Sequence, residues 1–197
     1  VNRSIADALG VGVGTVGVGL SISDAHAGGS IAVRANGSIS AQSLTLTADA
    51  DNTADAETYA LARGLIAGAI NYADANLDGT ASARLGSAAS VATVDDVMVQ
   101  ATMTNVGKAT GHGVTVGGIA VGGMVTTVDI GAGTGTMEVI AGLESGADIT
   151  SARYVTLEAS STSTGWASGE AAGGGAISVT GSLAEVDSDQ GTKVDIG

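Results

Sequence analysis

The chain has 197 residues, of which 32 are glycine, none is proline, cysteine or phenylalanine, and 2% are aromatic. Its 20 acidic side chains against 7 basic ones give a net charge of −13, which repels phosphate backbones and argues against nucleic acid as a partner. Alanine and valine supply much of the apolar content, so a compact core would be weakly stabilised, while regular alternation and a mean hydropathy of +0.35 argue against disorder.

The N-terminal segment alternates glycine with valine. Residues 10–37 read GVGVGTVGVGLSISDAHAGGSIAVRANG, and a period of two is typical of a β-strand whose successive side chains point to opposite faces. We expect residues 1–37 to be a partial repeat that supplies a returning hairpin arm. There is no run of about 18 apolar residues and no charged leader at Val1, so we expect neither a membrane span nor a signal peptide within the chain.

The clearest alternation runs from Ala48 to Leu85. Small residues, mostly alanine, occupy the even positions of 48–62, and acidic or larger residues occupy the odd ones. After Gly64 the small residues move to odd positions. We therefore expect two long antiparallel arms folded at residues 62–65, with one small face and one polar face. A helix is excluded because a period of 3.6 would not separate alanine from aspartate by odd and even number.

Three segments align as copies of one repeat. LTLTADADN, VMVQATMTN and VTLEASSTS begin at Leu44, Val97 and Val155, with offsets of 97 − 44 = 53 and 155 − 97 = 58 residues. This register predicts repeat units at 38–86, 87–141 and 142–197 after the partial unit 1–37. Carried forward without gaps, it places Gly64, Gly117 and Gly175 in one column where each arm folds back, Ile66, Ile119 and Ile177 in another, and Leu85 beside Glu138 and Ile196.

The expected fold class is all-β: an elongated, Gly/Ala-rich, β-solenoid-like repeat protein with long stacked antiparallel β-hairpins. A face of Ala, Gly and Ser is too shallow to fill the usual gap of roughly 10 Å between packed sheets. An isolated two-stranded hairpin is marginal in water, so something must cover the small faces. We expect neighbouring repeats of the parent chain or self-association through these faces, with a homotrimer as one form of homo-oligomer.

The pattern resembles the repeat regions of giant bacterial surface proteins, including the filamentous-haemagglutinin-like adhesins. The resemblance rests on VGVGTVGVGLSIS, GSISAQSLTLTADADNTADA, GSAASVATVDDVMVQATMTNVGKA and SGADITSARYVTLEASSTS. It implies a secreted, extracellular shaft on the cell surface whose repeats give length and rigidity.

Acidic residues raise the question of calcium. The Gly-Gly-x-Gly-x-Asp-x-apolar-x repeat of calcium-binding β-rolls is absent, and Ala54 stands where an EF-hand loop starting at Asp49 needs glycine. We expect these acids to be solvated and no cofactor to be bound. The alternative is surface calcium at a small set of aspartates, namely Asp49, Asp51, Asp55, Asp187 and Asp189.

No catalytic set stands out. The chain has no cysteine and only His26 and His112, in different units, which excludes a nucleophilic triad and a three-histidine zinc site within it. The pair Asp95–Asp96 could act in glycoside hydrolysis only across a sugar-binding cleft, and the four aromatic residues are scattered. The glycine strings lack the Lys-[Ser/Thr] of a phosphate-binding loop.

We therefore expect a non-enzymatic structural repeat segment, a shaft or stalk, of a large secreted bacterial surface protein that extends and displays it for cell adhesion. The alternative is a glycan- or protein-binding module that contacts a host or partner-cell surface through its hairpin tips.

Overall fold

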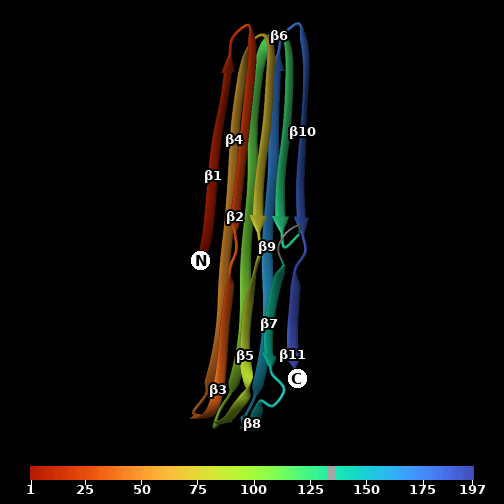
Figure 1. The fold of residues 1–197 in the computed structure, drawn as a ribbon. Helices are drawn as coiled ribbons and strands as arrows, with labels where there is room; N and C mark the ends of the chain where they lie inside the picture. The colour runs from red at the N-terminus through yellow and green to blue at the C-terminus, as the bar shows by residue number, and fades with distance from the viewer. Residues whose placement is uncertain (133–135) are drawn as a thin grey trace.

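The computed structural model describes residues 1–132 and 136–197, and strands account for most of them (Figure 1). The expected all-β character is confirmed. Among these residues there is no helix of the length and apolarity needed to cross a membrane. The strands are β1 (Asn2–Val13), β2 (Val16–Ala27), β3 (Ser30–Ala41), β4 (Leu44–Leu77), β5 (Gly79–Thr93), β6 (Val97–Ile130), β7 (Met137–Leu143), β8 (Asp148–Ser151), β9 (Val155–Gly174), β10 (Ile177–Ser188) and β11 (Gly191–Ile196).

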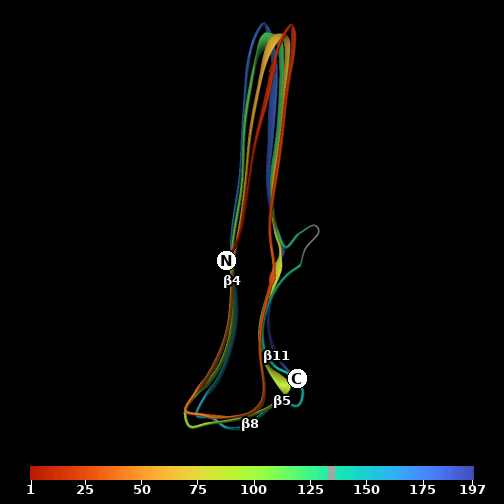
Figure 2. The same ribbon diagram turned by 60° about the vertical axis from the view of Figure 1, so that its left-hand side comes forward.

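Each repeat forms a tall, narrow loop of chain. One arm rises to the tip, a second arm returns, and a shorter segment crosses the base. The rising arms of successive repeats form one layer and the returning arms a second, and the two layers diverge towards the base (Figures 1 and 2). The strands β4 and β6 have 34 residues each and contain both arms, with Gly64 and Gly117 at their tips. In the first and last repeats the two arms are separate strands, β1 with β2 and β9 with β10.

The expected fold class is wrong, because every strand pairing in the described part of the chain is parallel. The strands form two sheets, ordered β1-β4-β6-β10 with β2 and β9 attached, and β11-β7-β5-β3 with β8 attached. The two arms of one repeat do not form an antiparallel hairpin ladder. Each arm instead pairs with the equivalent arm of the next repeat, and the two arms of one repeat pack face to face; in the first repeat the backbone at Gly10 and Gly12 lies directly against the opposite arm.

The pairing register follows the sequence alignment as far as the end of β6. Leu44 pairs with Val97, which pairs with Val155, and Gly64 pairs with Gly117. The alignment of Leu85 with Glu138 is wrong, since Leu85 pairs with Leu143. The offset changes between Ile130, which pairs with Leu77, and Met137, which pairs with Gly79. The longer second offset therefore comes from an insertion between Ile130 and Met137.

The small faces are covered by the chain itself. Ala54 and Ala56 on the rising arm of β4 and Ala73 and Ala75 on its returning arm are fully buried in one core cluster. Towards the base, where the layers diverge, the buried residues become larger and include Leu85, Val91 and Val139. The size of the inward side chains thus follows the spacing of the two layers.

Candidate functional site

The interface between repeats contains a buried ladder of amides. Asn2 Nδ2 donates to Asn52 Oδ1 at 3.0 Å, Asn52 Nδ2 donates to Asn105 Oδ1 at 3.0 Å, and Asn105 Nδ2 donates to Ser163 Oγ at 3.1 Å. Asn52 and Asn105 are almost completely buried. An amide has both a donor and an acceptor, so the three asparagines of this column, with Ser163 in the last repeat, satisfy one another only when the repeats are in register.

Large and small side chains also compensate one another across the two layers. A Cβ at Gly107 would lie closer than 3.0 Å to Val128 Cγ1, and a Cβ at Gly165 would be equally close to Val186 Cγ1. In the preceding repeat the residues aligned with Gly107 and Val128 are two alanines, Ala54 and Ala75. The pair is therefore Gly–Val in one repeat and Ala–Ala in another, and the layer spacing is kept.

The expected fold-back glycines stack on one another at the tips. A Cβ at Gly117 would lie 2.5 Å from the carbonyl oxygen of Gly64, and a Cβ at Gly64 or Gly175 would clash with the carbonyl of Gly14 or Gly117. Only glycine lets each backbone approach the preceding one this closely. The column at Gly64, Gly117 and Gly175 is thus a packing requirement of stacked turns.

The outward side chains of the rising arms link neighbouring repeats. Lys108 Nζ lies 3.6 Å from Asp55 Oδ1, and the ring of His112 stacks on Tyr59 with centroids 5.0 Å apart. His112 Nδ1 also lies 3.4 Å from Glu170 Oε2 in the next repeat. A hydrogen bond from the Tyr59 hydroxyl to Glu57, together with slight desolvation, raises the pKa of Tyr59. These contacts are exposed and each adds little stability.

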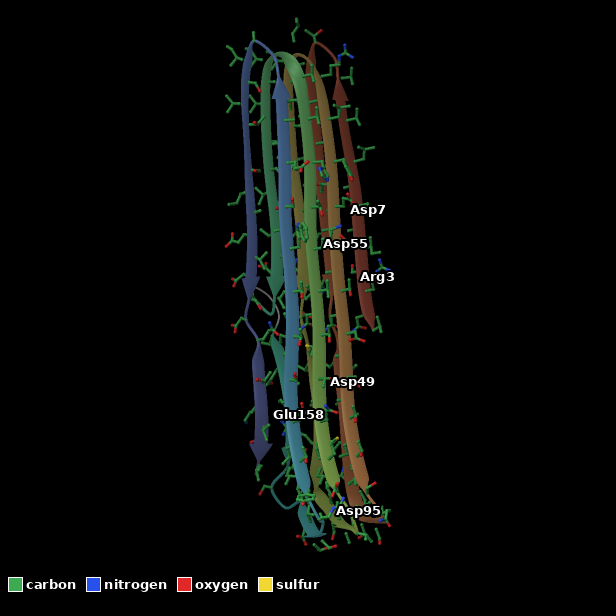
Figure 3. All side chains as sticks on the ribbon, turned by 180° about the vertical axis from the view of Figure 1, so that it is seen from behind. Arg3, Asp7, Asp49, Asp55, Asp95 and Glu158 are labelled. Carbon is green, nitrogen blue, oxygen red and sulfur yellow. The ribbon has the colours of Figure 1, made fainter. Side chains whose placement is uncertain are left out.

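The calcium candidates lie on different arms. Asp49, Asp51 and Asp55 alternate along the outer face of the rising arm of β4, whereas Asp187 lies on β10 and Asp189 follows it. Asp49 accepts a hydrogen bond from Thr102. The labelled carboxylates of Asp7, Asp49, Asp55 and Glu158 are spread along the strands rather than gathered (Figure 3). Residues 1–132 and 136–197 contain no group of three or more His, Cys, Asp or Glu placed to hold a metal ion.

Acidic residues do gather on the returning arms. Asp129 pairs in register with Asn76 on one side and Asp187 on the other. Partial burial, and then the nearby charges of Asp74, Asp187 and Glu185, raise the pKa of Asp129. Burial and the nearby acids together disfavour the ionised form of Asp129. None of the ion pairs found in the described residues places a basic side chain on Asp129.

The Asp95–Asp96 pair is held at the base by Arg153. Arg153 Nε lies 3.1 Å from Asp96 Oδ1, and its Nη1 lies 3.7 Å from Asp95 Oδ1. The hydrogen bond to Asp96 and the charges of both aspartates raise the pKa of Arg153. The two carboxylates are used in an ion pair between repeats.

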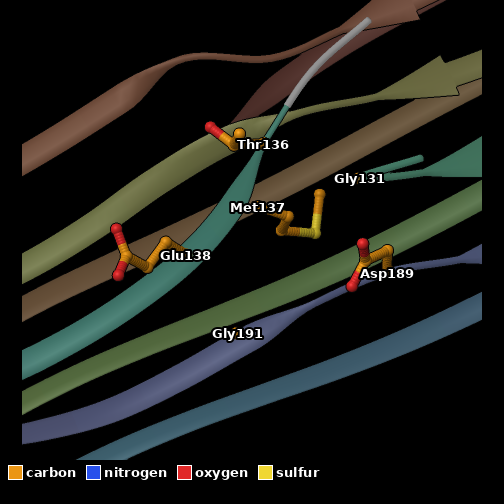
Figure 4. Close-up of a pocket in the computed structure, with 6 residues that line it drawn as sticks. All are labelled: Gly131, Thr136, Met137, Glu138, Asp189 and Gly191. Atoms are coloured by element: carbon orange, nitrogen blue, oxygen red, sulfur yellow. The ribbon is translucent and has the colours of Figure 1, made fainter. Parts of the chain in front are cut away.

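A shallow pocket lies between β7 and the β10–β11 connection and is lined by Gly131, Thr136, Met137, Glu138, Asp189 and Gly191 (Figure 4). The side chain of Met137 lies between the carboxylates of Glu138 and Asp189. The two acids therefore do not converge as the catalytic pair of a glycosidase would.

The two outermost repeats present open sheet edges. The sheet order places β1 at one end and β10 at the other, and β2, β3, β9 and β11 each pair on one side only within the described residues. Every residue of β10 is exposed, including Ser182 and Val186, whose partners Met124 and Val128 in the preceding repeat are buried. Each edge carries the backbone ladder that joins repeats inside the molecule, so it can accept a further parallel strand.

Sequence reasoning missed the asparagine ladder, although Asn52 and Asn105 occupy one column of the alignment. It also assigned the outward face to water, whereas near the tips that face carries exposed valine, isoleucine and leucine. No known protein family, curated protein or solved structure matches the chain.

Proposed function

We propose that the chain is a structural repeat segment of a large, secreted bacterial surface protein, in which it extends the molecule and has no enzymatic role. The observation that carries this proposal is the in-register parallel pairing of whole repeats, from Leu44 with Val97 to Leu77 with Ile130. Each repeat buries its small side chains within itself and offers its backbone edges to the next one.

This arrangement lets the protein lengthen by simple addition. A further repeat on either edge meets a backbone ladder and a glycine tip like those inside the chain; in the amide column it meets Asn2 at one edge and the hydroxyl of Ser163 at the other. Mechanical resistance then comes from many backbone hydrogen bonds acting together along the stack. The acidic surface keeps the segment soluble, and further repeats of the same kind cover its edges.

Duplication of residues 44–96 within the full chain tests the proposal. The extra unit restores the Leu44–Val97 register at both junctions, so the longer chain should fold with unchanged strand content. Small-angle scattering should show growth of about 4.8 Å across the stack, one strand spacing, with the height along the arms unchanged. A duplicated chain that is unfolded, or that grows along the arms, would contradict the proposal.

The alternative function, a binding module, predicts a different result. It requires a ligand at the tips, so glycan-array binding by the 197-residue chain should be lost when Arg63 and Leu65, both exposed at a tip, are replaced by serine. A spacer gives no array signal in either form.

A further inference from the structure

The returning arms carry an apolar outer face over about the first eight residues after each tip. Its outward positions lie on β2, on the second halves of β4 and β6, and on β10, and we call this surface the return-arm face. Most of its large side chains are well exposed, including Val16, Leu20, Ile70 and Val179. It consists of Val16, Val18, Leu20, Ile22, Ile66, Gly68, Ile70, Tyr72, Ile119, Val121, Gly123, Val125, Ile177, Val179, Gly181 and Leu183.

This face carries no charged side chain. Its lower limit is a row of acids, with Asp24 paired to Asp74 and, across Thr127, Glu185 in the same row. The opposite outer face, on the rising arms, has charged groups within the same distance of the tips, among them Arg63 and Glu170. The rising-arm face also exposes apolar side chains such as Leu9, Val11 and Val13, so the two outer faces differ in charge.

The return-arm face has the composition of a surface that packs on another sheet. Valine and isoleucine are the residues that fill the gap of roughly 10 Å between stacked sheets, yet here the inner gap is filled by alanine and glycine. Four strands about 4.8 Å apart and about eight residues of 3.3 Å rise give a flat apolar area of about 500 Å². A patch of this size is at the upper end of what monomeric proteins expose.

We propose that the return-arm face binds the same face of a second copy of this chain. Two such faces bury about 1,000 Å² in total, the area of a weak, transient contact between two proteins. The charge layout sets the orientation: copies pointing the same way would bring their acidic rows together, whereas antiparallel copies place each row beyond the partner's tips. The contact is a closed, two-fold pair, unlike the open-ended addition of repeats at the sheet edges.

Two matched variants on β6 test this interface. Val121 lies on the return-arm face, and Val114 lies on the opposite face the same number of residues from the Gly117–Gly118 turn; they are 51% and 43% exposed. Val121→Lys and Val114→Lys change the net charge equally, and both are outward, so the fold is kept. Circular dichroism of each variant, which should match that of the unchanged chain, checks this.

Sedimentation of the full chain should show a monomer–dimer equilibrium with a dissociation constant of about 10–100 µM. Val121→Lys should weaken it about tenfold or more, because the lysine ammonium would be desolvated in an apolar contact, and Val114→Lys should leave it unchanged. The proposal would be overturned by a chain that stays monomeric or by equal weakening of the dimer in both variants. It would also be overturned by species larger than a dimer that Val121→Lys does not affect, or by a monomer that binds phosphatidylcholine vesicles instead. The last two outcomes identify edge addition or a lipid surface as the occupant.

Discussion

The compensating Gly107–Val128 pair gives a quantitative test of how the two layers pack. In Gly107→Ala the new Cβ would lie closer than 3.0 Å to Val128 Cγ1 and 2.9 Å from Leu77 Cδ1, against an optimal carbon–carbon separation of about 3.5–4.0 Å. The layers or side chains must move by about 1 Å, and overpacking of this kind costs about 1–3 kcal/mol. Val128→Ala removes two buried methyl groups and leaves a cavity, at a cost of about 2 kcal/mol.

The double variant recreates the alanine pair that the preceding repeat already has at Ala54 and Ala75. In the double variant the new Cβ at position 107 occupies space that the two removed methyl groups of Val128 leave, so the clash is relieved and the cavity is partly filled. The net loss is one buried carbon, so the double variant should lose only about 1 kcal/mol of stability. Urea unfolding followed by circular dichroism gives the four free energies, and the coupling should reach about 2 kcal/mol or more. Additive losses would refute the assignment of these two residues as direct partners across the layers.

Two further predictions concern charge and turn packing. The pKa of Asp129 is raised in the folded state, so the folded chain holds the proton to higher pH than the unfolded chain, and stability falls as pH rises from about the ordinary value of 3.8. Asp129→Asn, which copies the aligned Asn76, should therefore raise the urea midpoint at pH 7 and leave it unchanged at pH 3; a lower midpoint at pH 7 would contradict the assigned crowding. Gly117→Ala should cost about 1–3 kcal/mol, since its Cβ would lie 2.5 Å from the Gly64 carbonyl oxygen. Gly123→Ala, whose Cβ meets no atom within 4 Å, should gain about 0.4–1 kcal/mol, and equal effects in thermal melts would dismiss the stacked tips.

Periodicity predicted the repeat register because identical positions of successive repeats must lie side by side. The columns at Leu44, Gly64 and Ile66 could be read from the sequence, and the structure pairs each with its expected partner in the next repeat. The alignment of Leu85 with Glu138 failed because a gapless register does not see the insertion after Ile130.

Alternation could not predict which strands share hydrogen bonds. Small residues at every second position show that one face is buried closely, but an antiparallel hairpin and two facing parallel sheets have the same pattern along a single strand. The deciding information is the identity between repeats, such as Asn52 above Asn105, which only parallel pairing in register uses. Outward valines were likewise ambiguous, since alternation gives the face of a residue and not what covers it.

Parallel pairing between repeats underlies both the fold and the proposed function, and disulfide formation tests it in a chain that has no cysteine of its own. Asp55 and Lys108 are neighbours in the parallel register, whereas Asp55 and Tyr72 point outward from opposite faces. An antiparallel hairpin folded at residues 62–65 would instead place Asp55 opposite Tyr72. Under mild oxidation the double variant Asp55→Cys/Lys108→Cys should cross-link within one chain and Asp55→Cys/Tyr72→Cys should not. The reverse result would contradict the parallel arrangement.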